Sequence, residues 1–103
     1  MPDNSALTET TYYILLSLYR PLHGYGIMQR TAELSGGRVH LAAGTLYGAL
    51  NAMVDRGWIL LLPGESRKKE YQLTPKGLGV LKKELARLRE LVASGDLVMK
   101  EEG

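Results

Sequence analysis

The sequence predicts a mainly α-helical fold with a small β-wing, that is, a winged helix-turn-helix with an added C-terminal dimerisation helix. One observation is the order of patterns from Leu41 to Lys76, which is a helical pattern, a short apolar run, a charged loop and an alternating segment. Another is a leucine-rich helical pattern that follows Pro75. This order places a helix and a positive loop on one side of a small domain, where a nucleic-acid duplex could contact both.

The composition indicates one domain with little net charge. The chain has 103 residues, with 13 Lys and Arg against 11 Asp and Glu, so the formal net charge is only +2. A chain of this length forms one modest core, which we expect a partner chain to complete. Because the net charge is small, nucleic-acid binding has to be argued from where the cations lie.

Neither cysteine nor a targeting segment is apparent. The absence of cysteine excludes disulfides and cysteine-based metal sites, and it fits a cytoplasmic location. The N-terminal residues lack the pattern of a signal peptide, and the longest apolar run, Trp58–Leu62, is far too short to span a bilayer. We therefore expect no membrane association.

Two helices are predicted in the first third of the chain. Residues 1–7 have the character of a flexible N-terminal arm, and Thr8 is the expected N-cap of a first helix that Pro21 ends. Residues 23–26 predict a glycine-rich turn into a second helix, which ends at Gly36-Gly37. Four residues at helical spacing should form its inner face: Ile27, Met28, Thr31 and Leu34.

A third helix is predicted from Ala43 to Arg56, with Gly57 as its stop, after a short strand over residues 38–41. On a helical wheel Tyr47 lies at the edge between two faces. The core face should contain Leu46, Leu50, Met53, Val54 and Gly57. The opposite face should contain Gly44, Thr45, Gly48, Asn51, Ala52 and Asp55.

The outer face of this third helix has the residue types of a major-groove helix. Thr45 can donate to a phosphate or a base, and Asn51 can pair with an adenine edge. Gly44 and Gly48 allow a close backbone approach, while Tyr47 is placed to send its hydroxyl to a phosphate. The face holds no Lys or Arg, however, so an ordinary amphipathic surface helix explains this helix alone at least as well.

A predicted hairpin over residues 58–74 forms the wing and adds the missing positive charge. Its loop contains Arg67, Lys68 and Lys69, which suit a clamp on DNA phosphates when they lie beside a groove-sized helix. The alternative is a solvated hairpin tip, which is the usual explanation of a short charge run.

The last predicted helix covers residues 75–95, with Thr74 as cap and Pro75 at its first position. Its leucines recur at spacings of three and four, the pattern of a helix that packs on another helix. We expect a homodimer in which the first helix supplies the other side of the interface, followed by a flexible tail over residues 96–103. The predicted interface residues are Leu15, Leu18, Leu81, Leu85, Leu88 and Val92.

The motifs of common enzymes and metal sites are missing. His23 and His40 have no ligand partners at metal spacing, and no serine lies in a nucleophile elbow. Residues 24–26 are too short for a dinucleotide loop and follow no strand. We therefore predict a non-enzyme with no catalytic residue, no metal and no cofactor.

Four short stretches, taken together, match one known family of regulators. They are His23–Ile27, Gly44–Tyr47 with Leu50, Gly57–Ile59 and Lys69–Gly77. On these stretches the sequence resembles the PadR-like transcriptional regulators over roughly residues 8–92. The resemblance implies a homodimeric, cytosolic repressor whose winged helices bind a palindromic double-stranded DNA operator, and some relatives release DNA when a small-molecule effector binds.

The resemblance also implies roles for individual residues. Thr45 and Tyr47 would contact the operator, the basic residues of the wing would bind phosphate, and Thr74 to about Gly95 would correspond to the single dimerisation helix of the short-tailed branch. The sequence departs from the family pattern at Ala42-Ala43, where a Ser-Pro pair is common, at Glu70 and Gln72 in the wing, and in the last helix, which has no aromatic residue.

Two hypotheses of different classes remain from the sequence. The first is a sequence-specific DNA-binding transcriptional regulator, a repressor relieved by a small-molecule effector. The alternative is a winged-helix module for dimerisation or protein interaction that does not bind DNA.

Overall fold

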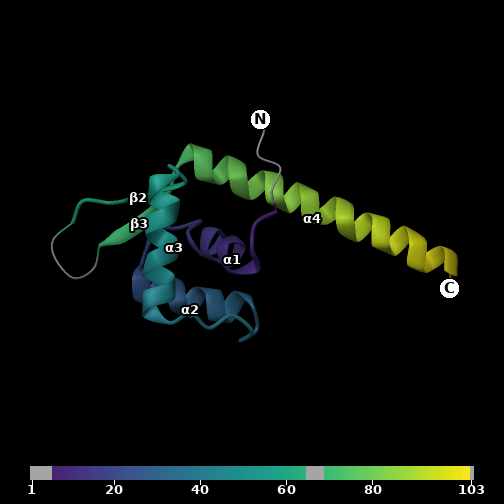
Figure 1. Cartoon of the computed structure of the whole chain (residues 1–103), viewed down its shortest axis with the longest axis horizontal. Coiled ribbons are helices and arrows are strands. Elements are labelled where there is room, and N and C mark those ends of the chain that lie inside the picture. Colours follow the sequence, from purple (N-terminus) through teal and green to yellow (C-terminus); the bar gives the residue numbers. More distant parts are fainter. Residues whose placement is uncertain (1–5, 65–68, 103) are drawn as a thin grey trace.

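The computed structural model describes residues 6–64 and 69–102, which form helices packed around a small antiparallel sheet (Figure 1). The elements are α1 (Glu9–Ser17), β1 (Leu22–His23), α2 (Gly24–Leu34), α3 (Ala43–Asp55), β2 (Ile59–Leu61), β3 (Glu70–Leu73) and α4 (Pro75–Glu102). The predicted fold class, a mainly α winged helix-turn-helix with an added C-terminal helix, is confirmed.

The sheet has the strand order β1-β3-β2 and is antiparallel throughout. The wing strands β2 and β3 pair Ile59 with Leu73, and β1 pairs Leu22 with Tyr71. The prediction of a strand over residues 38–41 is wrong, because these residues pair with no strand in the described part of the chain. The Val39 N–H instead donates to Ser35 Oγ at 2.9 Å.

The predicted helix boundaries hold where a cap defines them. Thr8 Oγ1 accepts from the Thr11 N–H at 3.1 Å, and the stops after α2 and α3 have the left-handed φ values that favour glycine, including 78° at Gly57. Two boundaries differ from the prediction. Helix α1 ends at Ser17, well before Pro21, and α2 already begins at Gly24, so the stretch 23–26 belongs mostly to its first turn.

The core is formed by the inner faces of α1, α2 and α3 against the sheet. Leu34, Val54 and Gly57, predicted to face inward, are exposed, the first two to 36% and 38%, because each lies in or just after the last turn of its helix. The largest fully buried side chains are Ile14, Leu15, Leu18, Ile27, Thr31, Leu46, Leu50 and Ile59.

Helix α4 is attached to the wing through the carbonyl oxygen of Trp58. Thr74 donates to this oxygen from its backbone N–H and from its hydroxyl, both at 3.0 Å. The Thr74 hydroxyl also accepts from the Gly77 N–H at 3.0 Å, so it caps the helix as predicted. Gly77 lies so close to Trp58 that a Cβ atom there would collide with the carbonyl group.

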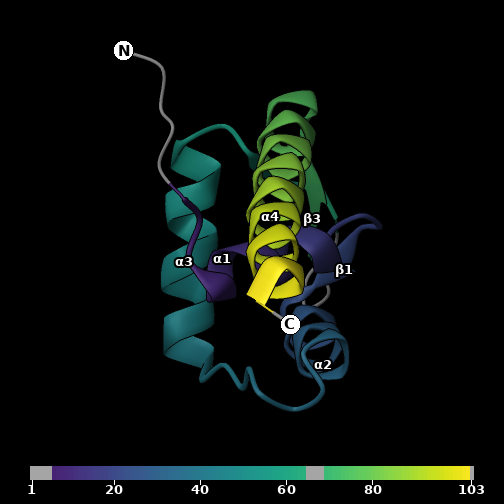
Figure 2. The same ribbon diagram turned by 90° about the vertical axis from the view of Figure 1, so that its right-hand side faces the viewer.

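Helix α4 then crosses over α1 and extends away from the domain, so that its C-terminal half stands clear (Figures 1 and 2). Its 28 residues run unbroken through Gly95, so the predicted helix end at residue 95 is wrong and the segment expected as a tail is helical to Glu102. No helix in the described ranges is both long and apolar enough to cross a membrane.

Two glycines of α4 offer a matched test of this attachment. Gly77→Ala should destabilise the protein by about 1–3 kcal/mol, because the new methyl group has to displace backbone at Trp58. Gly79→Ala meets no atom within 4 Å and should stabilise it by about 1 kcal/mol through helix propensity. Urea unfolding followed by circular dichroism measures both, and equal effects of the two substitutions would contradict the close contact.

Candidate nucleic-acid interface

The outer face of α3 is open, and small and neutral side chains dominate it. Gly44, Thr45, Gly48 and Asn51 are all exposed. The N-cap residue Ala42 makes no side-chain cap bond, so the first backbone N–H groups of α3 remain available to an outside acceptor. The surface can therefore approach a groove closely and can donate hydrogen bonds from its N-terminal end.

The side chain of Tyr47 turns away from this face and packs against the start of α2. Its side chain is 45% exposed, and a Cβ atom on Gly24 would collide with the Tyr47 hydroxyl group. The ring thus packs on the domain while part of the side chain remains in solvent, in the position expected for a residue at the edge of the two faces. Gly24, which the sequence suggested only as a turn residue, is therefore required by packing, because a side chain there would collide with Tyr47.

Beside Tyr47 lies a hollow of about 320 Å³, between α2, α3 and the wing. Tyr71 on β3 is buried in its wall, and burial, together with the nearby Tyr47 hydroxyl, raises the pKa of Tyr71. We call this site the tyrosine hollow. Its lining residues are His23, Gly24, Tyr25, Tyr47, Leu61, Lys69 and Tyr71.

The wing contributes one described cation to this side of the domain. Lys69 is exposed just before β3, and the hairpin continues beyond β2 with the Leu62 N–H donating to the Glu70 carbonyl oxygen at 2.8 Å. Arg67 and Lys68, the other two predicted phosphate contacts, lie outside the described residues.

The predicted dimer residues do not form one exposed stripe. Leu15 and Leu18 are buried in the domain's own core, as is Leu81, so the prediction that the first helix faces a partner through Leu15 and Leu18 is wrong. Leu85 and Leu88 are half-buried.

Val92 is 62% exposed, and together with its neighbour Leu91, which is 55% exposed, it begins the apolar surface that remains free. The continuation of this surface at Leu97, Val98 and Met99 was not predicted from the sequence. The signal was the helical spacing that continues past Gly95, where the helix was expected to end.

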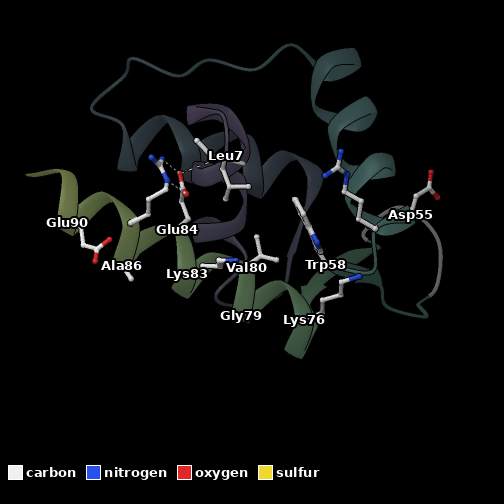
Figure 3. A pocket seen from close by; sticks show the side chains of 13 residues that line it. Leu7, Asp55, Trp58, Lys76, Gly79, Val80, Lys83, Glu84, Ala86 and Glu90 are labelled. Carbon is white, nitrogen blue, oxygen red and sulfur yellow. Dashed lines mark hydrogen bonds and ion pairs between the residues drawn. The ribbon is translucent and has the colours of Figure 1, made fainter. Parts of the chain in front are cut away.

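A second concave site lies between α4 and Trp58 (Figure 3). It has a volume of about 950 Å³ and draws its walls from α4, the end of α3 and the segment before α1. The Arg56 guanidinium lies 5.0 Å from the centroid of the Trp58 ring, within cation–π range. We call this site the Trp58 groove.

At the far end of the Trp58 groove, Glu84 joins α4 to the N-terminal segment. It is almost completely buried, accepts from Arg87 at 2.7 and 2.6 Å, and accepts from the Leu7 N–H at 3.2 Å. The Arg87 guanidinium, and then the Leu7 N–H, hold the pKa of Glu84 below its ordinary value although burial opposes them. The ionised carboxylate is therefore the form that the folded protein favours.

An open helix beside a β-wing, with a helix-turn-helix behind it and a long added helix, defines the class of winged helix-turn-helix proteins. Residues 14–83 match the family model described as the transcriptional regulator PadR-like family, which covers more than half of the chain. The chain belongs to the PadR-like family of transcriptional regulators, so the resemblance seen in the sequence is confirmed.

Solved structures agree with this fold. A PadR family transcription regulator from hypervirulent Clostridium difficile R20291 superimposes with a TM-score of 0.74 and 21% identity, covering 89% of this chain and 99% of that one. BpsR of Bordetella bronchiseptica, whose DNA binding is regulated by 6-hydroxynicotinic acid, gives a TM-score of 0.69 and 18% identity, covering 89% of this chain and 62% of that one.

One curated sequence relative is an uncharacterized 37.1 kDa protein in transposon TN4556 of Streptomyces fradiae, 38% identical over 64 residues. The match covers 62% of this chain but only 18% of that relative, so this chain spans less than a fifth of the protein it matches.

The buried carboxylate predicts a specific pH dependence. A depressed folded-state pKa stabilises the protein above the unfolded-state value, and this stabilisation disappears as the pH falls. Glu84→Gln should therefore lower the melting temperature at pH 7, and its difference from wild type should shrink below about pH 4.3, where a free glutamate titrates.

Thermal melts from pH 3 to pH 7 measure this difference. Glu90→Gln is the matched control, because Glu90 is exposed on the same helix and also lines the Trp58 groove. A difference between wild type and Glu84→Gln that is constant over this pH range would contradict the role of the ionised carboxylate.

Proposed function

We propose that this chain is a transcriptional regulator that binds duplex DNA with the outer face of α3 and contacts phosphates with the wing. The observation that supports it most directly is the open, small-residue face of α3 beside exposed Lys69. Its family consists of transcriptional regulators, which supports the same assignment and a role without catalysis. We further propose that it acts in the cytoplasm, together with the DNA that it binds. We also propose that it is a repressor.

Each residue of the α3 face has a distinct role in this proposal. Asn51 contacts a base edge, where a bidentate amide contact discriminates adenine. Thr45 donates to phosphate or base, and Tyr47 donates its hydroxyl to a phosphate. Gly44 and Gly48 meet no other atom within 4 Å, which leaves room for DNA to approach the helix backbone.

We also propose that the DNA-binding form is a homodimer held by the exposed half of α4. Leu91 and Val98, like Val92 and Met99, are seven residues apart and lie on one side of the projecting helix, and an exposed apolar side of this kind marks an interface with another chain. A two-fold dimer presents two equal heads, so its operator should be a palindrome with half-sites about 34 Å apart.

The proposed repressor is relieved by a small-molecule effector. The regulation of BpsR by 6-hydroxynicotinic acid supports this part of the proposal by analogy of fold. We place this effector in the Trp58 groove, which is the larger of the two concave sites described above and has an aromatic ring in its wall.

The competing assignment is a winged-helix module for dimerisation or protein interaction without DNA binding. The lack of Lys and Arg on the outer face of α3 favours it. Selection of bound fragments from random duplex DNA separates the two, because a regulator should retain a common palindromic sequence and an interaction module should retain none.

The wing and α3 should respond differently to substitution. Lys69→Ala should weaken binding to all sequences alike and reduce the slope of log K against log salt by about 0.9, because one phosphate is no longer neutralised. Asn51→Ala should leave the slope unchanged and relax the preference at one position in each half-site, by about 1–3 kcal/mol. Salt titrations on the selected site and on scrambled DNA measure both effects.

The reverse pattern would show that the wing reads the base sequence and that α3 contacts the phosphates. In that case Lys69→Ala would abolish sequence preference, while Asn51→Ala would change only the salt dependence.

Val92→Lys should convert the dimer into monomers, because it places a charge in the apolar surface of α4. Ala86→Lys is the matched control, since it adds the same charge to the same helix at an exposed position whose neighbours one turn before and after are charged and not apolar. Sedimentation equilibrium at micromolar concentration distinguishes the two. A wild-type protein that sediments as a folded monomer would contradict the dimer proposal itself.

A further inference from the structure

We infer that the tyrosine hollow binds one phosphate of the DNA backbone, as a third contact site between α3 and the wing. This inference rests on the proposed function and adds to it a role for α2 and β3. Three features of the hollow support it: an unpartnered hydroxyl, an uncapped helix start and the charge of the lining residues.

The hydroxyl of Tyr71 has no partner within the described part of the chain. Tyr71 is only 8% exposed, lines the hollow and makes no hydrogen bond to any described residue. No buried polar side-chain atom in the described ranges is sealed from solvent without a partner, so this hydroxyl has access to solvent, and the hollow is the opening that Tyr71 lines. A nearly buried donor of this kind favours an acceptor that enters from outside.

The start of α2 supplies backbone donors on the same side. His23 is the N-cap residue and makes no side-chain cap bond, so no side chain satisfies the first N–H groups of this 11-residue helix. The helix dipole adds partial positive charge at Gly24 and Tyr25, which both line the hollow. Unlike a bare helix end, this one faces a hollow that already contains a buried hydroxyl.

The lining side chains favour an anion. Lys69 contributes a positive charge, and the tyrosines at positions 25, 47 and 71 contribute hydroxyl groups. No carboxylate is found among the described lining residues, although Glu70 pairs with His23 across the strands. Hydroxyls, an ammonium group and backbone N–H groups are donors that suit the oxygens of a phosphate.

The position of the hollow identifies the source of that phosphate. Tyr47 belongs both to α3 and to the wall of the hollow, so DNA that lies along the outer face of α3 brings its backbone past this opening. The lack of a side chain at Gly24 leaves room for the Tyr47 hydroxyl beside the hollow, because a Cβ atom at position 24 would collide with this hydroxyl.

The test is Tyr71→Phe, which removes the hydroxyl and keeps the ring that packs in the sheet. We expect about a 10-fold or greater fall in affinity for operator and scrambled DNA alike, the effect of removing a hydrogen bond to a charged group. Because a neutral donor displaces no counterion, the salt slope should stay unchanged, in contrast to Lys69→Ala. Tyr12→Phe, a partly buried tyrosine of α1 outside the hollow, is the matched control.

DNA with single phosphates replaced by neutral methylphosphonates locates the contact. One replacement in each half-site should weaken the wild type more than it weakens Tyr71→Phe, because Lys69 and the backbone N–H groups still contact that phosphate in the variant. A second arm titrates inorganic phosphate into the DNA-free protein and follows the tyrosine resonances. Binding of free phosphate at the hollow, without any methylphosphonate effect, would assign the site to a free anion and overturn the inference.

The failure of the hollow and the failure of the proposed function give different results. If the wild type binds its selected site and Tyr71→Phe binds it equally well with an unchanged melting temperature, the hollow is not a contact but the regulator remains. If the wild type retains no duplex at all, both ideas fail together.

Discussion

The close contact of Gly77 and Thr74 with the carbonyl group of Trp58 fixes the relation between the two halves of this protein. Trp58 lies between α3 and the first strand of the wing, and its carbonyl oxygen accepts a hydrogen bond from the backbone of Thr74, the residue that caps α4. Because a side chain at position 77 has no room, the direction in which α4 leaves the domain is set by backbone geometry. The placement of the wing and the exit of the long helix therefore cannot vary independently.

A second close approach organises the opposite end of the wing. Tyr47 lies over Gly24, and its hydroxyl faces the hollow that Tyr71 and Lys69 also line. Residues from α2, α3 and β3 thus meet around one aromatic side chain. A shift of any of these elements would therefore change the position of Tyr47. The outer face of α3, although it has few charged residues, is in this way linked to α2 and to the wing.

Much of the fold could be predicted from the sequence because local signals define it. Thr8, Thr74 and Gly57 mark helix ends through caps and backbone conformation, which depend on neighbouring residues. Leu15 and Leu18 were assigned to a partner because helical spacing cannot distinguish the domain's own core from another chain. The strand β1 and the Trp58 groove depend on contacts between distant segments, so no local pattern could reveal them.

The continuity of α4 through Gly95 has a mechanical consequence. A helix of 28 residues is a rigid rod about 42 Å long, with its domain fixed at one end. If two such rods cross near the middle of their exposed halves, each domain lies about 30 Å from the crossing, and a tilt of about 10° there moves it by about 5 Å, roughly one and a half base-pair steps of DNA. A ligand lodged against the base of the rod would therefore need only a small change in angle to bring the two heads out of phase with the double helix.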